Sequence, residues 1–115
     1  MAGDDFCYVT TRGRVTGRPH EIEIWYARAD DTLYVLSGSG EHSDWVRNLR
    51  ASPTVSVRLG GATCPARARV LDEGPEERRA RELVFEKYQP RYSGSLTAWR
   101  HAALPVAIDI VEHQS

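Results

Sequence analysis

Short segments in which every second residue is apolar, joined by tight turns, restrict the fold of this chain more than any other feature. Within residues 20–28, Ile22, Ile24 and Tyr26 fall on one side of an extended chain, and residues 54–59 and 105–111 alternate similarly. A period of two is typical of strands with one buried face. The connections are short, whereas parallel strands need crossovers of a dozen or more residues. The pattern therefore predicts antiparallel pairing and excludes a doubly wound parallel sheet.

Helical signals interrupt these strands at three places. Pro53 ends the first helix, because the residue before a proline avoids helical angles. Pro75, followed by Glu76 and Glu77, begins the second helix with carboxylates at its positive end. The predicted helices are 43–51, 74–88 and 96–102, and the predicted strands are 6–11, 20–28, 33–37, 54–59, 63–71 and 105–111. We therefore predict a mainly β (α+β) fold, a small barrel of about six antiparallel strands with two or three short helices.

Length and charge limit the classes of function. The 115 residues fit one domain, so we predict a single unit over residues 1–115. Fifteen basic residues against sixteen acidic ones give no bulk attraction to nucleic acid or to an anionic membrane. No apolar run reaches the length of a membrane span, and Cys7 and Cys64 have no metal-binding spacing. We expect a reduced, cytoplasmic protein that binds neither nucleic acid nor membrane.

The segment 10–18 carries the clearest chemical signal. It places three guanidinium groups and several hydroxyls around two glycines, where we expect exposed backbone amides. Such a bend is suited to an anionic group held by charge-assisted hydrogen bonds. A solvated hairpin turn with surface arginines is the alternative. The candidate binding residues of this segment are Arg12, Arg14, Thr16, Gly17 and Arg18, with His20 beyond it.

Two other segments carry candidate residues. Ser37, Gly38 and Ser39 form a loop that presents amides to a flat heterocycle or a phosphate, or is a plain connector. Trp45 lies off the apolar face of the first helix and either covers a pocket rim or packs in the core. Tyrosines near the C-terminal end supply hydroxyls for proton donation or belong to the core. The four histidines are scattered and predict no metal site.

Three blocks of this sequence together resemble a known family. The blocks are Thr10-Thr-x-Gly-Arg-x-Thr-Gly-x-Pro19, Ser37-Gly-x-Gly40 and Asp44-Trp-x-x-Asn-Leu-x-Ala-x-Pro53. They are similar to those of the deazaflavin-dependent nitroreductases, split β-barrel proteins of the flavin/deazaflavin oxidoreductase superfamily. The resemblance extends from about Tyr8 to Val111. It implies a split β-barrel that binds coenzyme F-420, a 5-deazaflavin with a ribityl phosphate and an oligoglutamate tail.

The resemblance also implies an activity and roles for residues. The activity is hydride transfer from the reduced cofactor to a small flat electrophile such as a quinone, nitroaromatic or unsaturated lactone. Arg14 matches the groove for phosphate and tail, Ser37 and Gly38 match positions beside the ring, and Trp45 opens the matched helix block. Tyr92, Tyr88 and Ser37 are the candidate catalytic residues. A homodimer is the assembly that such barrels commonly form.

The chain departs from the family at several positions. Members often carry basic residues where this chain has Val15, His20 and Gly38. Fewer positive contacts suit FMN, which has a single phosphate and no glutamate tail, so an FMN-dependent reductase of the same fold is one alternative. A non-catalytic carrier of a flavin or deazaflavin is the other. The amphipathic N-terminal extension of some relatives is missing, so we expect no membrane attachment.

Overall fold

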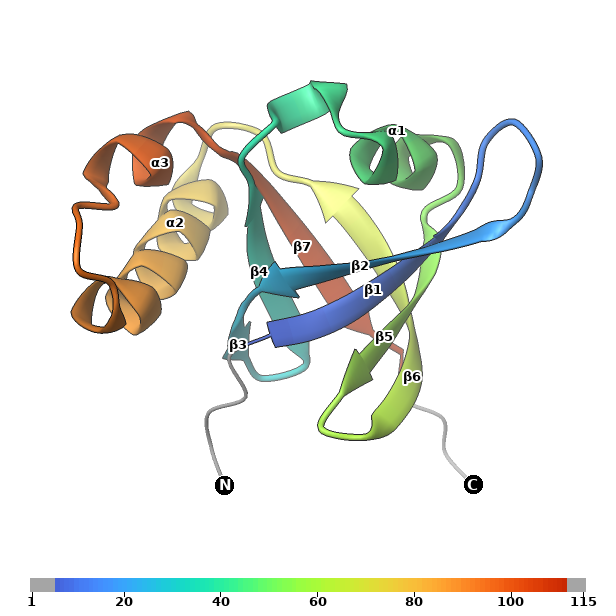
Figure 1. The fold of residues 1–115 in the computed structure, drawn as a ribbon, viewed down its shortest axis with the longest axis horizontal. Helices are drawn as coiled ribbons and strands as arrows, with labels where there is room; N and C mark the ends of the chain where they lie inside the picture. The colour runs from blue at the N-terminus through green and yellow to red at the C-terminus, as the bar shows by residue number, and fades with distance from the viewer. Residues whose placement is uncertain (1–5, 112–115) are drawn as a thin grey trace.

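Residues 6–111, described by a computed structural model, form one curled antiparallel sheet with three helices (Figure 1). The strands are β1 (Phe6–Arg12), β2 (Pro19–Trp25), β3 (Ala27–Ala29), β4 (Thr32–Ser37), β5 (Thr54–Leu59), β6 (Ala62–Val70) and β7 (Leu104–Ile110). The helices are α1 (Asp44–Ala51), α2 (Pro75–Tyr88) and α3 (Thr97–Ala102), with short 3-10 turns η1 (Gly40–His42) and η2 (Gln89–Arg91). The predicted split barrel and its antiparallel pairing are confirmed.

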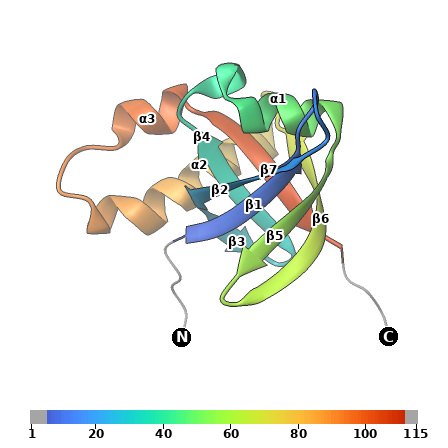
Figure 2. The same ribbon diagram turned by 45° about the vertical axis from the view of Figure 1, so that its right-hand side comes forward.

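The strand order is β2-β1-β5-β6-β7-β4-β3, so β2 and β3 lie at opposite edges of the sheet. Yet these two strands are separated along the chain by a single residue, Tyr26. The sheet therefore curls until its two edges approach each other, as Figure 2 shows from a second side. Helices α2 and α3 cover one side of the sheet, and α1 with η1 lies across one end (Figure 1).

The break at Tyr26 corrects the prediction of one strand over residues 20–28 and raises the strand number to seven. The Tyr88 hydroxyl accepts a hydrogen bond from the Tyr26 amide (3.0 Å) and donates one to the Tyr26 carbonyl (2.9 Å). Lys87 Nζ also donates to this carbonyl at 2.8 Å. Side chains of α2 thus hydrogen-bond both backbone groups of Tyr26, which therefore need no partner in the sheet. At this residue the chain leaves the edge strand β2 and enters the opposite edge strand β3.

Strand β4 has a continuous apolar run because both of its faces are buried. Leu33 and Val35 pack in a core shared with α1, whereas Tyr34 and Leu36 pack in a second core shared with α2. The α2 residues of that second core, Ala80, Val84 and Tyr88, are four positions apart and so lie on one face of the helix. The sheet is thus fixed between α1 and α2.

A polar network ties the outer face of this sheet to the start of α2. Arg69 on β6 donates to the Asp109 carboxylate (2.7 Å) and to both oxygens of Glu76 (2.8 and 2.9 Å). These bonds lower the pKa of Glu76 and of Asp109 below their ordinary values, with the Arg69 hydrogen bond as the main cause. Burial and the hydrogen bond to Glu76 raise the pKa of Tyr34 to about 12, so it stays a donor.

We expect the stabilisation that this network provides to be lost in acid. Because both carboxyl pKa values are depressed in the folded state, the unfolded chain binds protons more readily as the pH falls. The stabilisation is therefore present above the ordinary carboxyl pKa near 4 and is lost as the pH drops through the lowered values. Urea unfolding between pH 7 and pH 2.5 measures it. Arg69→Gln should lower the midpoint at pH 7 and flatten its fall; an equally steep fall would contradict this.

Candidate cofactor site

The loop between β1 and β2 is held in shape by its own backbone. The Gly13 amide donates to the Arg18 carbonyl, and the Gly17 amide donates to the Gly13 carbonyl, both at 2.8 Å. The Arg14 amide donates to Asn48 Oδ1 at 3.2 Å. These amides are engaged, so the expectation of exposed amides is wrong at these positions. Side chains, above all guanidinium groups, are what the loop offers to a ligand.

Glycine is required at two positions of this loop, each for a different structural reason. A Cβ at Gly13 would come within 2.9 Å of the His20 imidazole and 3.1 Å of the Arg18 carbonyl. Gly17 has a φ of +76°, where side chains are strained. The bend that carries Arg14 therefore depends on glycine at both positions.

Asn48 on α1 fixes this bend to the barrel. Its side-chain oxygen accepts hydrogen bonds from the Arg14 amide (3.2 Å) and from Arg14 Nη1 (2.8 Å). Its side-chain nitrogen donates to the buried Thr11 hydroxyl at 3.3 Å. Asn48 is only 3% exposed, so the side chain that holds the bend is itself buried. Asn48 is not among the residues predicted for the site, although it stands in the matched Trp-x-x-Asn block.

A cleft of about 440 Å³ lies between this loop and α1. It is lined by Gly13, Arg14, Val15, Thr16, His20, Glu21, Ile22, Asp44, Trp45 and Asn48. Four predicted binding residues, Arg14, Thr16, His20 and Trp45, are thus brought together. Trp45 is also a core residue, so both of its predicted positions apply. Arg12 and Gly17 line a different hollow beside β5, and Arg18 is exposed.

The loop after β4 connects this cleft to the other side of the site. Ser37 is buried, and its hydroxyl contacts the Gly40 carbonyl (3.3 Å) and the Ser43 hydroxyl (3.2 Å). Ser43, the first residue of the predicted helix, directly precedes α1, and its hydroxyl donates to the Gly40 carbonyl rather than capping the helix. Gly38 and Ser39 are exposed. The segment 37–44 therefore extends from the end of β4 to the cleft at Asp44.

Aromatic rings form a wall beside Gly38. Trp99 on α3 packs next to it, with Nε1 3.6 Å from the place where a Gly38 Cβ would lie. The Trp25 ring meets Trp99 edge-on at 5.6 Å between centroids and Tyr92 edge-on at 6.1 Å, and it stacks on Tyr88 at 4.4 Å. Trp25 is a further member of the site that is not among the predicted residues. The wall joins two of the predicted positions, Gly38 and Tyr92.

The two candidate tyrosines differ in what their hydroxyls can do. Tyr88 is 2% exposed, and its hydroxyl is engaged by both backbone groups of Tyr26. Tyr92 is 48% exposed, and its hydroxyl makes no hydrogen bond to any residue between 6 and 111. Tyr88 thus secures the edge of the sheet, whereas the Tyr92 hydroxyl has no such structural role among residues 6–111.

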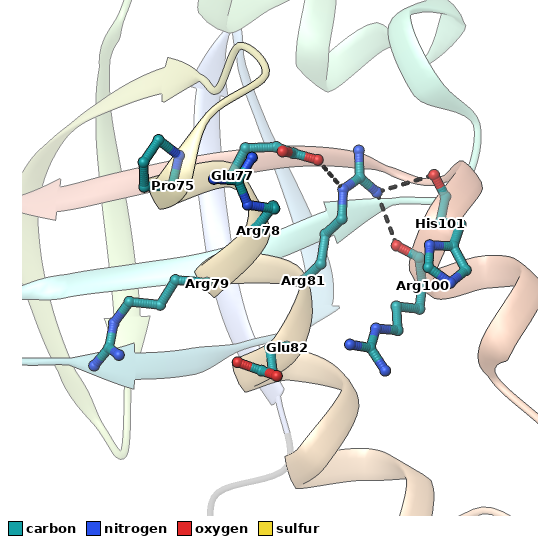
Figure 3. Close-up of a pocket in the computed structure, with 8 residues that line it drawn as sticks. All are labelled: Pro75, Glu77, Arg78, Arg79, Arg81, Glu82, Arg100 and His101. Atoms are coloured by element: carbon teal, nitrogen blue, oxygen red, sulfur yellow. Dashed lines mark hydrogen bonds and ion pairs between the residues drawn. The ribbon is translucent and has the colours of Figure 1, made fainter.

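A second cleft, of about 630 Å³, lies along α2 and α3 (Figure 3). Arg81 crosses between the two helices: Nη1 donates to the carbonyls of Arg100 (2.8 Å), His101 (3.2 Å) and Ala103 (2.7 Å). Its Nε donates to Glu77. Figure 3 shows the guanidinium reaching to α3, while the Arg79 side chain extends away from it. Arg81 therefore holds α3, the helix that carries Trp99, against α2. None of the predicted ligand-binding residues lines this cleft.

The two thiols offer no activated nucleophile in the fold. Cys7 is buried in the core, and this burial raises the pKa of its thiol to about 12. Cys64 is half-buried on β6. The chemistry of the site therefore rests on its guanidinium, hydroxyl and aromatic groups.

Among residues 6–111, the structure has no helix that is both long and apolar enough to cross a membrane.

Several known proteins resemble this chain in sequence or in fold. A curated F420H(2)-dependent quinone reductase of Mycobacterium tuberculosis is 28% identical over 87 residues, which are 72% of this chain and 58% of that protein. The chain thus spans less than two thirds of this relative's length. A solved F420-H2 dependent reductase (FDR-A) is 26% identical with a TM-score of 0.73, over 91% of this chain and 93% of that one.

Other solved structures share the fold at lower identity. A haem storage protein of Vibrio cholerae is 14% identical, with a TM-score of 0.69 over 95% of this chain and 83% of that one. Such a likeness shows the split barrel alone. The family model described as "F420H(2)-dependent quinone reductase" matches residues 1–110, nearly the whole sequence. The resemblance seen in the sequence is confirmed, and the chain belongs to the F420H(2)-dependent quinone reductase family.

Proposed function

We propose that this protein binds coenzyme F-420 and reduces a small flat acceptor, of which a quinone is the leading candidate. The observation that carries the proposal is Arg14, held by Asn48 at the mouth of a cleft that a short loop connects to an aromatic wall. A planar ring with an anionic tether needs a flat apolar surface for the ring and a fixed cation for the tether. The residues present therefore fit the group.

Each part of the site has a role in this proposal. Arg14, with Thr16 and His20 beside it, would hold the phosphate and acidic tail, and the loop at Ser37 and Gly38 would border the ring. When bound, the reduced deazaflavin supplies a hydride. A quinone becomes a hydroquinone on gaining one hydride and one proton, so a proton must be delivered to the acceptor oxygen. Tyr92, whose hydroxyl is exposed, is the proposed donor. Trp25, which meets the Tyr92 ring edge-on, and Trp99, which meets Trp25, would form the apolar surface beside it.

An FMN-dependent reductase is the second candidate, and one observation favours it. Arg14 is the one arginine among the residues that line the cleft, and Asp44 and Glu21 lie there with it. A single guanidinium beside two carboxylates suits a single phosphate better than a tail with several negative charges. A non-catalytic carrier is the third candidate. The exposed Tyr92 hydroxyl gives it less support, since a carrier has no use for a proton donor.

Titration of the purified protein with F-420 and with FMN, followed by fluorescence quenching, separates these candidates. We expect tighter binding of F-420. Arg14→Ala should weaken it about 10- to 100-fold, because hydrogen bonds to charged groups are worth about 1.5–3 kcal/mol. The loss should shrink as salt rises. Arg28→Ala, which removes an exposed arginine paired with Asp31 at the β3–β4 turn, is the control. Tighter binding of FMN, or equal affinity for Arg14→Ala and the native protein, would reject the proposal.

For the assembly we propose a homodimer. A solved structure that is 26% identical, with a TM-score of 0.73 over 91% of this chain and 79% of that one, is described as a domain-swapped dimer. Light scattering of the purified protein measures the mass directly.

A further inference from the structure

The Arg14 guanidinium has two contacts of very different character. Nη1 donates to Asn48 Oδ1 at 2.8 Å, a bond that lies on a side chain only 3% exposed. Nη2 reaches Asp44 Oδ1 at 3.4 Å, and the Asp44 side chain is 85% exposed. The first contact is short and made to a buried residue, whereas the second is long and open to water. One end of the guanidinium is therefore fixed, and the other is held only weakly.

Asp44 stands where a ligand anion would need to stand. It lines the same cleft as Arg14, and its carboxylate takes the guanidinium nitrogen that Asn48 leaves for an external partner. The other acid of the cleft, Glu21, differs because it is paired with Arg58 at 3.2 Å. Asp44 is thus the acid that neutralises the cation of the cleft directly.

We infer that Asp44 is an internal competitor for Arg14, and that it sets how strongly the cleft favours anionic ligands. This inference rests on the proposed function. When a phosphate or a tail carboxylate enters, it replaces Asp44 on Nη2 while Asn48 keeps Nη1 in place. The bound anion then lies close to a displaced carboxylate, and this repulsion lowers affinity more for a ligand with several negative charges than for one with a single phosphate. Asp44 is therefore a specificity-determining residue.

Removing the charge of Asp44 while keeping its shape tests the inference. We expect Asp44→Asn to bind F-420 about three- to tenfold more tightly than the native protein at low salt, with a smaller gain for FMN. Both gains should disappear at high salt. Asp44 is also in the first turn of α1, where a carboxylate favours the helix, so the same variant should melt at a slightly lower temperature. If Asp44 only supported the structure, Asp44→Asn would lower the affinity for F-420 together with the melting temperature.

Two further variants show whether the effect passes through Arg14. Glu41→Gln removes a negative charge that precedes the same helix but is paired with Arg50 at 3.3 Å, so it should change F-420 affinity less than twofold. In an Arg14→Ala background, Asp44→Asn should give no gain. Binding of F-420 with no difference between Asp44→Asn and the native protein would overturn the inference and leave the proposed function standing. Absence of F-420 binding to the native protein would overturn both.

Discussion

Replacing Tyr92 with phenylalanine is expected to lower the turnover of quinone reduction about 100-fold, the lower end of what proton transfer by a positioned side chain contributes. The hydroxyl is the part of Tyr92 that would reach an acceptor, and the ring contact with Trp25 remains in the variant. F-420 affinity should therefore change less than twofold. Steady-state kinetics with a quinone, together with a cofactor titration, measure both quantities.

Tyr88→Phe provides the matched control, because it removes the other candidate hydroxyl. That hydroxyl is bonded to both backbone groups of Tyr26, so its loss should cost about 1–3 kcal/mol of stability. Turnover per folded molecule should fall far less than in Tyr92→Phe. The two variants thus separate a hydroxyl that acts on a substrate from one that holds the fold. Unchanged turnover in Tyr92→Phe would assign the proton to solvent.

Arg81→Met is expected to have the largest effect on stability, about 2–4 kcal/mol, or roughly 10 °C in melting temperature. The Arg81 side chain is 18% exposed and bonds three carbonyls at the end of α3 as well as Glu77. Methionine keeps an unbranched apolar side chain at this position but leaves these acceptors without their donor. Urea and thermal unfolding measure the loss.

The same variant should loosen α3 before the rest of the molecule. Trp99 lies on that helix and contacts Trp25, so its fluorescence and the exchange of α3 amide hydrogens report the change locally. Arg79→Met is the control, since Arg79 is exposed on the same helix and extends away from α3 (Figure 3). An equal loss of stability in the two variants would show that Arg81 acts only through its general charge.

Local patterns in the sequence were sufficient to predict most of the secondary structure. Alternation identified the strands, and the proline and carboxylates at the start of α2 identified its first turn. These signals come from residues a few positions apart. The break at Tyr26 could not be predicted in this way, because it depends on Tyr88 and Lys87, about sixty residues later.

The site shows the same division between local and distant signals. The bend around Arg14 was visible in its glycines, and the cleft does gather Arg14, Thr16, His20 and Trp45. The pairing of Arg14 with Asn48 and Asp44 joins residues at least thirty positions apart. The sequence left open whether Tyr88 donates a proton or lies in the core, because no local pattern indicates which groups a buried hydroxyl bonds. Roles that depend on hydrogen bonds across the fold therefore required the structure.

The arrangement at Tyr26 also determines where the barrel is mechanically softest. Within residues 6–111, adjacent strands of the sheet are joined by backbone ladders, but its outer edges, β2 and β3, are linked by a single residue gripped by two side chains of α2. Moving β2 and β3 apart disturbs few hydrogen bonds, whereas separating any other two neighbouring strands breaks a backbone ladder. Slow opening motions of the barrel should therefore occur mainly between β2 and β3, and α2 should move with these strands.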